Sequence, residues 1–491
     1  MRKLRVLGCC FGLALLFALD GCGYPTRNLE ASVVDELHGY RWANLAPSAP
    51  EHTLVVVTAS GGGSRAAALT LSVLRGLDKI VLADGQTLAQ KVDVISSVSG
   101  GSVAAAYFAL KGRQGFDSLE QDFLRQDGIG ALLGDGLNPI GLATLATENK
   151  ERIDLLIDYF NRQLFKGATY QTLLDERHRP FLVLNAADMV EGVPFSFTQR
   201  KFDLLCSDLA KLPLATAVAA SAAFPVALSP VTLTDYQPCA AVGGKHWPPA
   251  WVDANLDDPA KPFAEPSLWY DNPQRATLGR VEYAYALGKR AAPGKQKRYI
   301  HLLDGGIADN LGIFEPYRML TTRDTQPSFL GEIDSGRITK LIFIVINARS
   351  FSASALDESQ ATPGLFDMLA ASINAPIDRT TAGVANQLRE LLRDEFRQLA
   401  LADPTHAARF HNLAANTALI SVDFDAIADN SCRRKFQSIP TSWTLDSREV
   451  DALMRVGEAL LANDPAFADL LRLTGARRPN LPSLAEACTG L

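Results

Sequence analysis

The sequence predicts an α/β domain with a mostly parallel central sheet, followed by a mainly helical C-terminal region. Short apolar runs rich in β-branched residues alternate with helical patterns, and the runs at 53–59 and 91–98 each end in a glycine-rich turn that leads into a helix. Repeated strand–turn–helix units imply parallel strands with helices on the faces of the sheet. Further buried strands are expected at 179–188, 298–306 and 340–348.

With 491 residues, the chain is longer than one hydrophobic core usually supports. Its composition, 47% hydrophobic and 21% charged, is typical of a globular protein. We expect a leader at 1–21, a linker at 22–50, an α/β domain at 51–350 and a helical extension at 351–491. Residues 231–297 are rich in Pro, Gly and aromatic side chains without a sustained period, which predicts an insertion that shapes or covers a site.

The N-terminus is typical of an export signal. Arg2, Lys3 and Arg5 precede an apolar stretch at 6–19 that is too short to span a bilayer. The stretch ends in Leu-Asp-Gly-Cys22, which resembles the lipobox of bacterial lipoproteins, in which this cysteine is lipidated. Asp20 replaces the small residue that the pattern prefers, so ordinary cleavage and an uncleaved anchor stay open as alternatives. We expect an exported protein of the cell envelope, anchored to a membrane through Cys22.

The charge and the cysteines limit the partners. Removal of the leader takes away three basic side chains and one acidic side chain and changes the net charge from −6 to −8, which argues against nucleic acid. No CxxC or HExxH motif indicates a metal. Four cysteines besides Cys22 allow three disulfide pairings in an oxidising compartment, and proximity in the sequence favours Cys206–Cys239 and Cys432–Cys488.

The second glycine turn carries a candidate nucleophile. The segment Ser97-Val98-Ser99-Gly100-Gly101 is similar to the G-x-S-x-G turn, in which a serine is exposed between a strand and a helix at the carboxyl edge of an α/β sheet. Glycines relieve the crowding of such a turn, and the Gly100 N–H at the helix start can face a developing oxyanion. The alternative is that Ser99 only caps the helix.

The first glycine turn, Ser60-Gly-Gly-Gly-Ser-Arg65, has backbone N–H groups that no side chain shields, so it can bind an anion. Gly61-x-Gly63-x-x-Ala66 with Asp84 further on also matches a dinucleotide fingerprint. Export conflicts with a nicotinamide cofactor, and that alternative leaves Ser99 unexplained.

The third turn places Asp304 at the end of an apolar strand, before Gly305 and Gly306, where a carboxylate can act as a base or simply hold a turn. His301 lies on the same strand and is expected to pack in the interior rather than complete a triad. Four other polar residues near strand ends are interpreted as structural: Asn185, Asp188, Asp309 and Asn310.

Together these turns resemble the patatin-like phospholipases, a family of three-layer α/β acyl hydrolases, over about 53–350. Its glycine motif D-G-G-G-x-R corresponds to 60–65, with Ser60 in place of the aspartate, and its nucleophile and acid motifs correspond to "SVSGG" and "DGG". A segment at 217–231 with a central Pro225 resembles the family's Ala/Ser-rich block beside the site.

The resemblance implies a Ser99 nucleophile, an Asp304 general base, no histidine, and neither metal nor cofactor. It implies that Arg65 braces the glycine loop and that the oxyanion hole draws on the N–H groups of Gly61, Gly62, Gly63 and Gly100. The expected activity is hydrolysis of acyl esters in membrane lipids. The alternatives are a non-catalytic lipid-binding lipoprotein and a transacylase or thioesterase on the same scaffold.

Beyond residue 350 the pattern is mostly helical. Residues 417–424 are a candidate edge strand, and Asp446 with Glu449 is typical of a helix capping box. Charges of both signs around the helix at 384–399 favour packing on the core over a membrane surface. The apolar face of that helix comprises Val384, Leu388, Leu391, Leu392, Phe396 and Leu399.

Overall fold

The computed structural model describes most of the chain outside the leader and the expected insertion. The described residues are 26–35, 37–45, 52–135, 150–176, 180–225, 227–236, 298–321, 329–350, 360, 364, 384–402, 405 and 407–489. Cys22, Cys239 and residues 237–297 therefore lie outside the described residues, together with the expectations attached to them.

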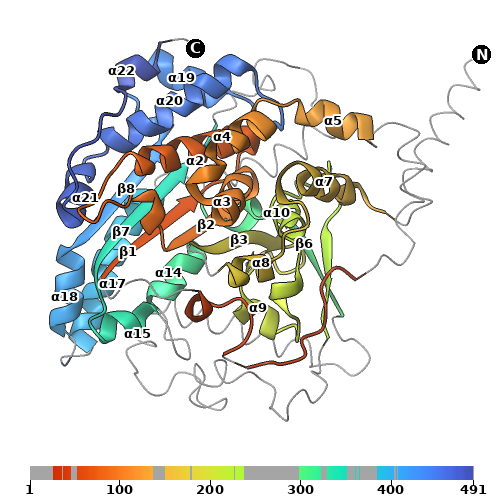
Figure 1. The fold of residues 1–491 in the computed structure, drawn as a ribbon, viewed down its shortest axis with the longest axis horizontal. Helices are drawn as coiled ribbons and strands as arrows, with labels where there is room; N and C mark the ends of the chain where they lie inside the picture. The colour runs from red at the N-terminus through yellow and green to blue at the C-terminus, as the bar shows by residue number, and fades with distance from the viewer. Residues whose placement is uncertain are drawn as a thin grey trace, which may run out of the picture.

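One sheet organises the fold (Figure 1). Its strand order is β5-β6-β3-β2-β1-β7-β8, and β4 pairs with β3 outside this path. The five strands from β3 to β8 in this order are mutually parallel, whereas β6, β5 and β4 join by antiparallel pairing. The strands are β1 (His52–Ala59), β2 (Val94–Val98), β3 (Phe181–Asp188), β4 (Pro194–Ser196), β5 (Val231–Thr234), β6 (Tyr299–Asp304), β7 (Ile338–Asn347) and β8 (Thr417–Asp423). The predicted α/β class with a mostly parallel sheet is confirmed.

The central strands are apolar because both of their faces are covered. Every residue of β2 and β3 is buried, and so are the last seven of β7. β4 and β5, which are not among the predicted strands, have only three and four residues, too few to show a period.

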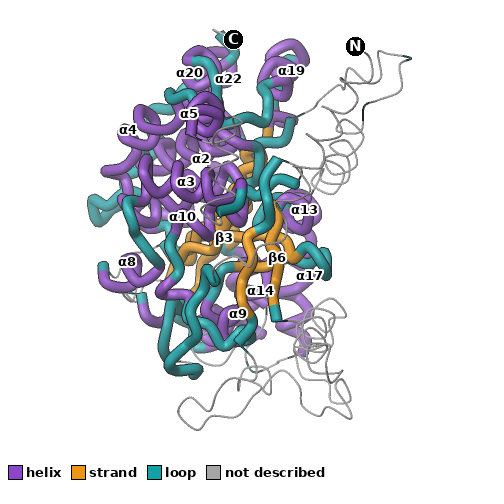
Figure 2. Tube along the Cα trace, turned by 90° about the vertical axis from the view of Figure 1, so that its right-hand side faces the viewer, coloured by secondary structure: helices purple, strands orange, loops and turns teal. Residues whose placement is uncertain are grey.

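Helices cover both faces of the sheet. Viewed from the side, α2, α3, α10 and α20 lie on one face and α13, α14 and α17 on the other (Figure 2). The helices are α2 (Gly63–Asp78), α3 (Ser99–Lys111), α4 (Phe116–Leu119), α5 (Gly128–Asp135), α7 (Arg152–Phe160), α8 (Tyr170–Asp175), α9 (Gln199–Asp203), α10 (Leu214–Ser221), α13 (Gly306–Asp309), α14 (Phe314–Thr321), α15 (Phe329–Asp334), α17 (Val384–Ala402), α18 (Ala407–Ala415), α19 (Asn430–Ser438), α20 (Ser447–Asn463), α21 (Phe467–Thr474) and α22 (Leu484–Ala487). This arrangement gives the three layers expected from the sequence.

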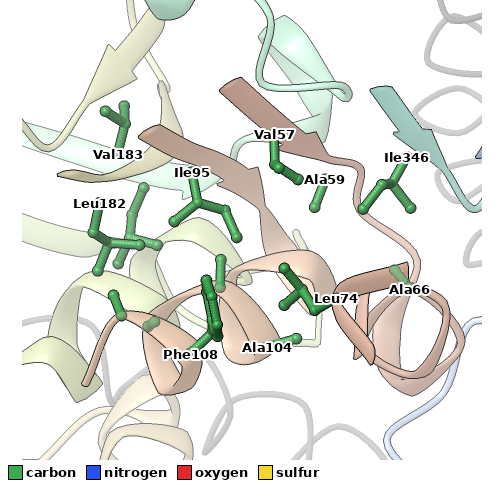
Figure 3. Packing of buried hydrophobic residues seen from close by; sticks show 14 of the residues in the cluster. Val57, Ala59, Ala66, Leu74, Ile95, Ala104, Phe108, Leu182, Val183 and Ile346 are labelled. Carbon is green, nitrogen blue, oxygen red and sulfur yellow. The ribbon is translucent and has the colours of Figure 1, made fainter. Parts of the chain in front are cut away.

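The helices α2 and α3 follow β1 and β2 directly and are buried on almost every side. Figure 3 shows Leu74, Ala104 and Phe108 of these helices against Ile95 and Leu182 of the sheet. Alanines and glycines let the two helices lie close to the strands, so the turns that precede them are fixed by the core.

The C-terminal region completes the same sheet. The predicted edge strand is confirmed as β8, which pairs in parallel with β7, and α20 packs along α2. Asp446 and Glu449 form the predicted capping box at the start of α20. The apolar face of α17 packs inward, since Leu388, Leu392 and Phe396 are buried.

A disulfide joins Cys432 of α19 to Cys488 at the end of α22, which confirms one of the two favoured pairings. The other pairing involves Cys239, outside the described residues. Among the described helices, none is long and apolar enough to cross a membrane.

Candidate active site

Ser99 occupies a sharp corner between β2 and α3. It is the first residue of α3 and adopts φ +50°, in the left-handed region that non-glycine residues seldom occupy. This conformation costs about 1–2 kcal/mol and persists only where neighbouring groups hold it. Ser99 as a whole is 7% exposed, so the corner is nearly closed from solvent.

Asp304 is the last residue of β6 and lies beside Ser99. The Gly306 N–H donates a hydrogen bond to the Asp304 carboxylate at 2.8 Å. Burial raises the pKa of Asp304 from 3.8 to about 6, although this bond and the nearby Ser99 hydroxyl group both oppose the rise. The two residues that the sequence predicts as nucleophile and acid therefore lie side by side.

The register of the sheet explains how the pair meets. Val98 pairs with Asn185 of β3, and the next residue of β3, Ala186, pairs with Asp304. β6 is antiparallel to β3 and pairs only with its last three residues, so β6 ends at the edge where β2 ends. Gly305 then crosses β3 so closely that a Cβ there would lie 2.2 Å from the Asn185 carbonyl oxygen.

The glycine loop between β1 and α2 packs directly on the Ser99 corner. A Cβ on Gly100 would lie 1.9 Å from the carbonyl oxygen of Gly63, and one on Gly101 would lie 2.6 Å from that of Ser60. Gly62 and Gly63 have φ values of +138° and +58°. Glycines are needed here because two backbones touch and the loop takes left-handed turns.

The amides of this region differ in their availability. The Gly61 N–H donates to the Asn310 carbonyl oxygen at 3.1 Å, so it is occupied and does not serve as an oxyanion donor in this conformation. The Ser99 N–H is likewise occupied, by the Ser221 hydroxyl oxygen at 2.9 Å. The N–H groups of Gly62, Gly63 and Gly100 have no acceptor among the described residues. They remain candidate oxyanion donors, whereas the Gly61 N–H would have to leave the Asn310 carbonyl oxygen to act as one.

Arg65 anchors the glycine loop from inside the protein. The residue is 2% exposed. Its guanidinium donates to the carbonyl oxygens of Ala348, at 2.9 Å, and Ile439, and to the Thr441 hydroxyl at 3.0 Å. The Ser64 N–H donates to the Ser442 carbonyl oxygen at 2.7 Å. The loop is thus held between the end of β7 and the segment before α20, partners that no sequence motif identifies.

The remaining predicted polar residues lie around the pair and not in it. His301 is half-buried and hydrogen-bonds Thr232 at 2.9 Å, and alternation along β6 places it on the face opposite Asp304. Asp188 accepts two turn N–H groups, and burial raises the pKa of Asp309, which accepts the Phe314 N–H at the start of α14. The sequence motifs do not single out Ser221, although a serine among the alanines of a buried helix is a signal of a local hydrogen-bonding role.

Residues 57–256 match the family model described as patatin-like phospholipase. The resemblance seen in the sequence is confirmed. The patatin-like match contains the glycine loop, Ser99 and α10, whereas Asp304 lies beyond it and is brought to Ser99 by the sheet.

Solved structures with some similarity include human GIVD cytosolic phospholipase A2, with 11% identity, a TM-score of 0.40, and 89% of this chain and 60% of that chain covered. The same human protein in complex with methyl gamma-linolenyl fluorophosphonate and terbium chloride has 15% identity, a TM-score of 0.28, and coverage of 64% and 45%. The ExoU-SpcU complex of Pseudomonas aeruginosa has 14% identity, a TM-score of 0.19, and coverage of 96% and 95%. The chain thus spans 60% or less of the human phospholipase chains. A search of curated proteins found no match.

We predict that Gly100→Ala separates the glycine loop from the Ser99 corner. The added methyl group meets backbone atoms, which cannot rotate away. We therefore expect the free energy of unfolding to fall by about 1–3 kcal/mol, and we expect Ser99 to lose its reactivity. Thermal unfolding and labelling by a fluorophosphonate measure the two effects. Gly134→Ala is the control, because no atom lies within 4 Å of its added Cβ. Normal labelling of Gly100→Ala would contradict the packing described.

A second prediction concerns Asp304→Asn, which removes an ionisable group with a raised pKa. Because burial penalises the ionised form, the variant is expected to be inactive but more stable than the wild type at pH 8, by up to about 3 kcal/mol. The difference should shrink between pH 6 and 4, where the folded wild type takes up the proton before the unfolded chain does. Urea unfolding of both proteins across this pH range measures the difference. A constant difference would show that the carboxyl group is not desolvated.

Proposed function

We propose that the chain is a serine acyl hydrolase that cleaves lipid acyl esters through the pair Ser99 and Asp304. The patatin-like phospholipase match supports lipid ester hydrolysis at the level of the family. The observation that carries the finer proposal is the position of the Ser99 hydroxyl group beside a buried carboxylate with a pKa of about 6. A carboxylate of ordinary pKa, about 3.9, is a weaker base toward a hydroxyl group.

In the proposed reaction, Ser99 Oγ attacks the ester carbonyl carbon while Asp304 takes the hydroxyl proton. The negative charge that forms on the carbonyl oxygen is bound by the free amides of Gly62, Gly63 and Gly100. Asp304 then gives its proton to the departing alcohol, which leaves an acyl ester on Ser99. Asp304 then deprotonates a water molecule that attacks the acyl carbon. As the bond to Oγ breaks, Asp304 returns this proton to Oγ, and the fatty acid leaves. One well-placed oxyanion donor is worth about 3 kcal/mol of barrier, so the loop contributes as a main element of catalysis.

Two alternative functions are compatible with the same fold. A transacylase or thioesterase would share the acyl-enzyme step and differ in the acceptor or the leaving group. A non-catalytic lipid-binding protein would not need the strained serine, the desolvated carboxylate or the free amides. The cost of holding Ser99 and Asp304 in these states favours a catalytic role.

We further propose that the protein is exported and anchored through Cys22, with membrane lipids as its substrates. The described residues on this side of the domain start at position 26, and their first side chains are docked on the domain. Arg27 pairs with Asp154 at 2.6 Å, and the Asn28 side chain donates to Ser207 and to Thr234 at 2.9 Å. Five residues span at most about 17 Å, so a lipid on Cys22 would keep the domain close to the membrane surface.

Labelling with a fluorophosphonate tests the catalytic proposal. The wild type is expected to react at one serine, and Ser99→Ala is expected to lose the label and more than about 1,000-fold of its esterase activity. The labelling rate should fall on acidification with a midpoint near pH 6, since the protonated Asp304 does not accept the hydroxyl proton. As a control, Ser72→Ala removes another buried serine and should keep both the fluorophosphonate labelling and the esterase activity. Label on the Ser99→Ala variant would refute the assignment.

Mass spectrometry of the mature N-terminus tests the anchor. We expect the chain to start at a diacylated or triacylated Cys22 and to sediment with membranes, because dual acylation gives stable membrane binding. The Cys22→Ser variant should be released from the membrane. An unmodified Cys22 in the wild-type protein would contradict the proposed lipid anchor.

A further inference from the structure

The C-terminal end of α10 lies between the two halves of the Ser99–Asp304 pair. Its last residue, Ser221, is fully buried and contacts the serine corner through its side chain and the acid turn through its backbone. We propose that Ser221 is a positioning residue that fixes the reactive conformation of Ser99. This inference deepens the proposed function and rests on it for its catalytic consequence.

The hydroxyl group of Ser221 is fully used. It donates to the Asn185 carbonyl oxygen at 2.6 Å, which commits its single proton. Its lone pairs accept the Ser99 N–H at 2.9 Å and face the Ser102 hydroxyl at 2.9 Å. The oxygen is thereby fixed between β3 and α3, and it holds the Ser99 amide in one direction.

The backbone at the end of α10 holds the acid in the same way. The Gly305 N–H donates to the Ser221 carbonyl oxygen at 3.1 Å, and the Asp304 N–H donates to that of Ala223 at 3.0 Å. The last carbonyl groups of a helix lack partners within the helix, so they are free to accept these donors. One residue therefore connects the nucleophile, through Oγ, with the acid turn, through its carbonyl group.

This connection has a specific consequence for Ser99. Its left-handed φ of +50° is unfavourable, and the bond to Ser221 satisfies a buried N–H only in that orientation. Ser221 touches no reacting atom. Its removal is expected to lower the rate of acylation while the placement of Asp304 stays unchanged.

The test compares Ser221→Ala with Ser72→Ala. Ser72 is a matched control because it is also fully buried and uses its hydroxyl group in the same two ways. It donates to the Met454 carbonyl oxygen at 2.6 Å and accepts the Glu458 N–H at 3.1 Å. Both variants should lose similar stability. Only Ser221→Ala should lower kcat and the rate of fluorophosphonate labelling, by about 10- to 100-fold, with KM and the midpoint near pH 6 unchanged.

Amide hydrogen exchange of the peptide that contains Ser99 gives a readout independent of activity. Exchange should rise in Ser221→Ala and not in Ser72→Ala. If the wild type lacks esterase activity, the proposed function fails, whereas faster exchange in Ser221→Ala still supports the positioning role. Ser221→Cys serves as a second variant if the alanine variant does not fold, and its weaker acceptor should give an intermediate rate. Labelling and exchange equal to those of Ser72→Ala would overturn the proposal.

Discussion

The approach of the Ser99 hydroxyl group to the Asp304 carboxylate is the interaction on which the rest of the site depends. Each partner is held in a state that it would not adopt alone. Ser99 has a left-handed backbone, and Asp304 is buried with a pKa raised by desolvation. Both states lower the stability of the fold, so the surrounding core must outweigh them. The strands β2 and β3 provide this support, since all of their residues are buried.

Much of this arrangement can be predicted from the sequence because the turns are local features. A buried parallel strand is a short apolar run, and a close turn after it requires glycine, so β1 and β2 with their turns stand out in the chain. The direction of β6 is not local. Asp304 reaches the site because β6 runs antiparallel and overlaps only the last residues of β3. Such a register depends on long-range pairing that no pattern within β6 encodes.

The supports of the glycine loop are also beyond a local pattern. Arg65 fits the family's glycine motif, yet its partners at Ile439 and Thr441 are 374 and 376 residues away in the chain. Its guanidinium is buried, so each N–H that loses its acceptor would be costly. The C-terminal region, which the sequence shows only as helical with a candidate edge strand, therefore extends the sheet through β8 and also fixes the candidate oxyanion loop. Two of these contacts, at Ile439 and Ser442, are made by backbone carbonyl groups, which leave no trace in the identity of the residues, and only Thr441 contributes a side chain.

The pattern of used and free amides defines what the site can bind. The amides of Gly61 and Ser99 are held by Asn310 and Ser221, so they fix the shape of the two turns and are not open to a ligand. The amides of Gly62, Gly63 and Gly100 have no acceptor among the described residues, and they lie where the two turns touch. In the proposed reaction, these unoccupied amides are the donors available to a negative charge that develops next to Ser99. Because the Gly61 and Ser99 amides are hydrogen-bonded inside the protein, they hold in place the two turns that carry the unoccupied amides.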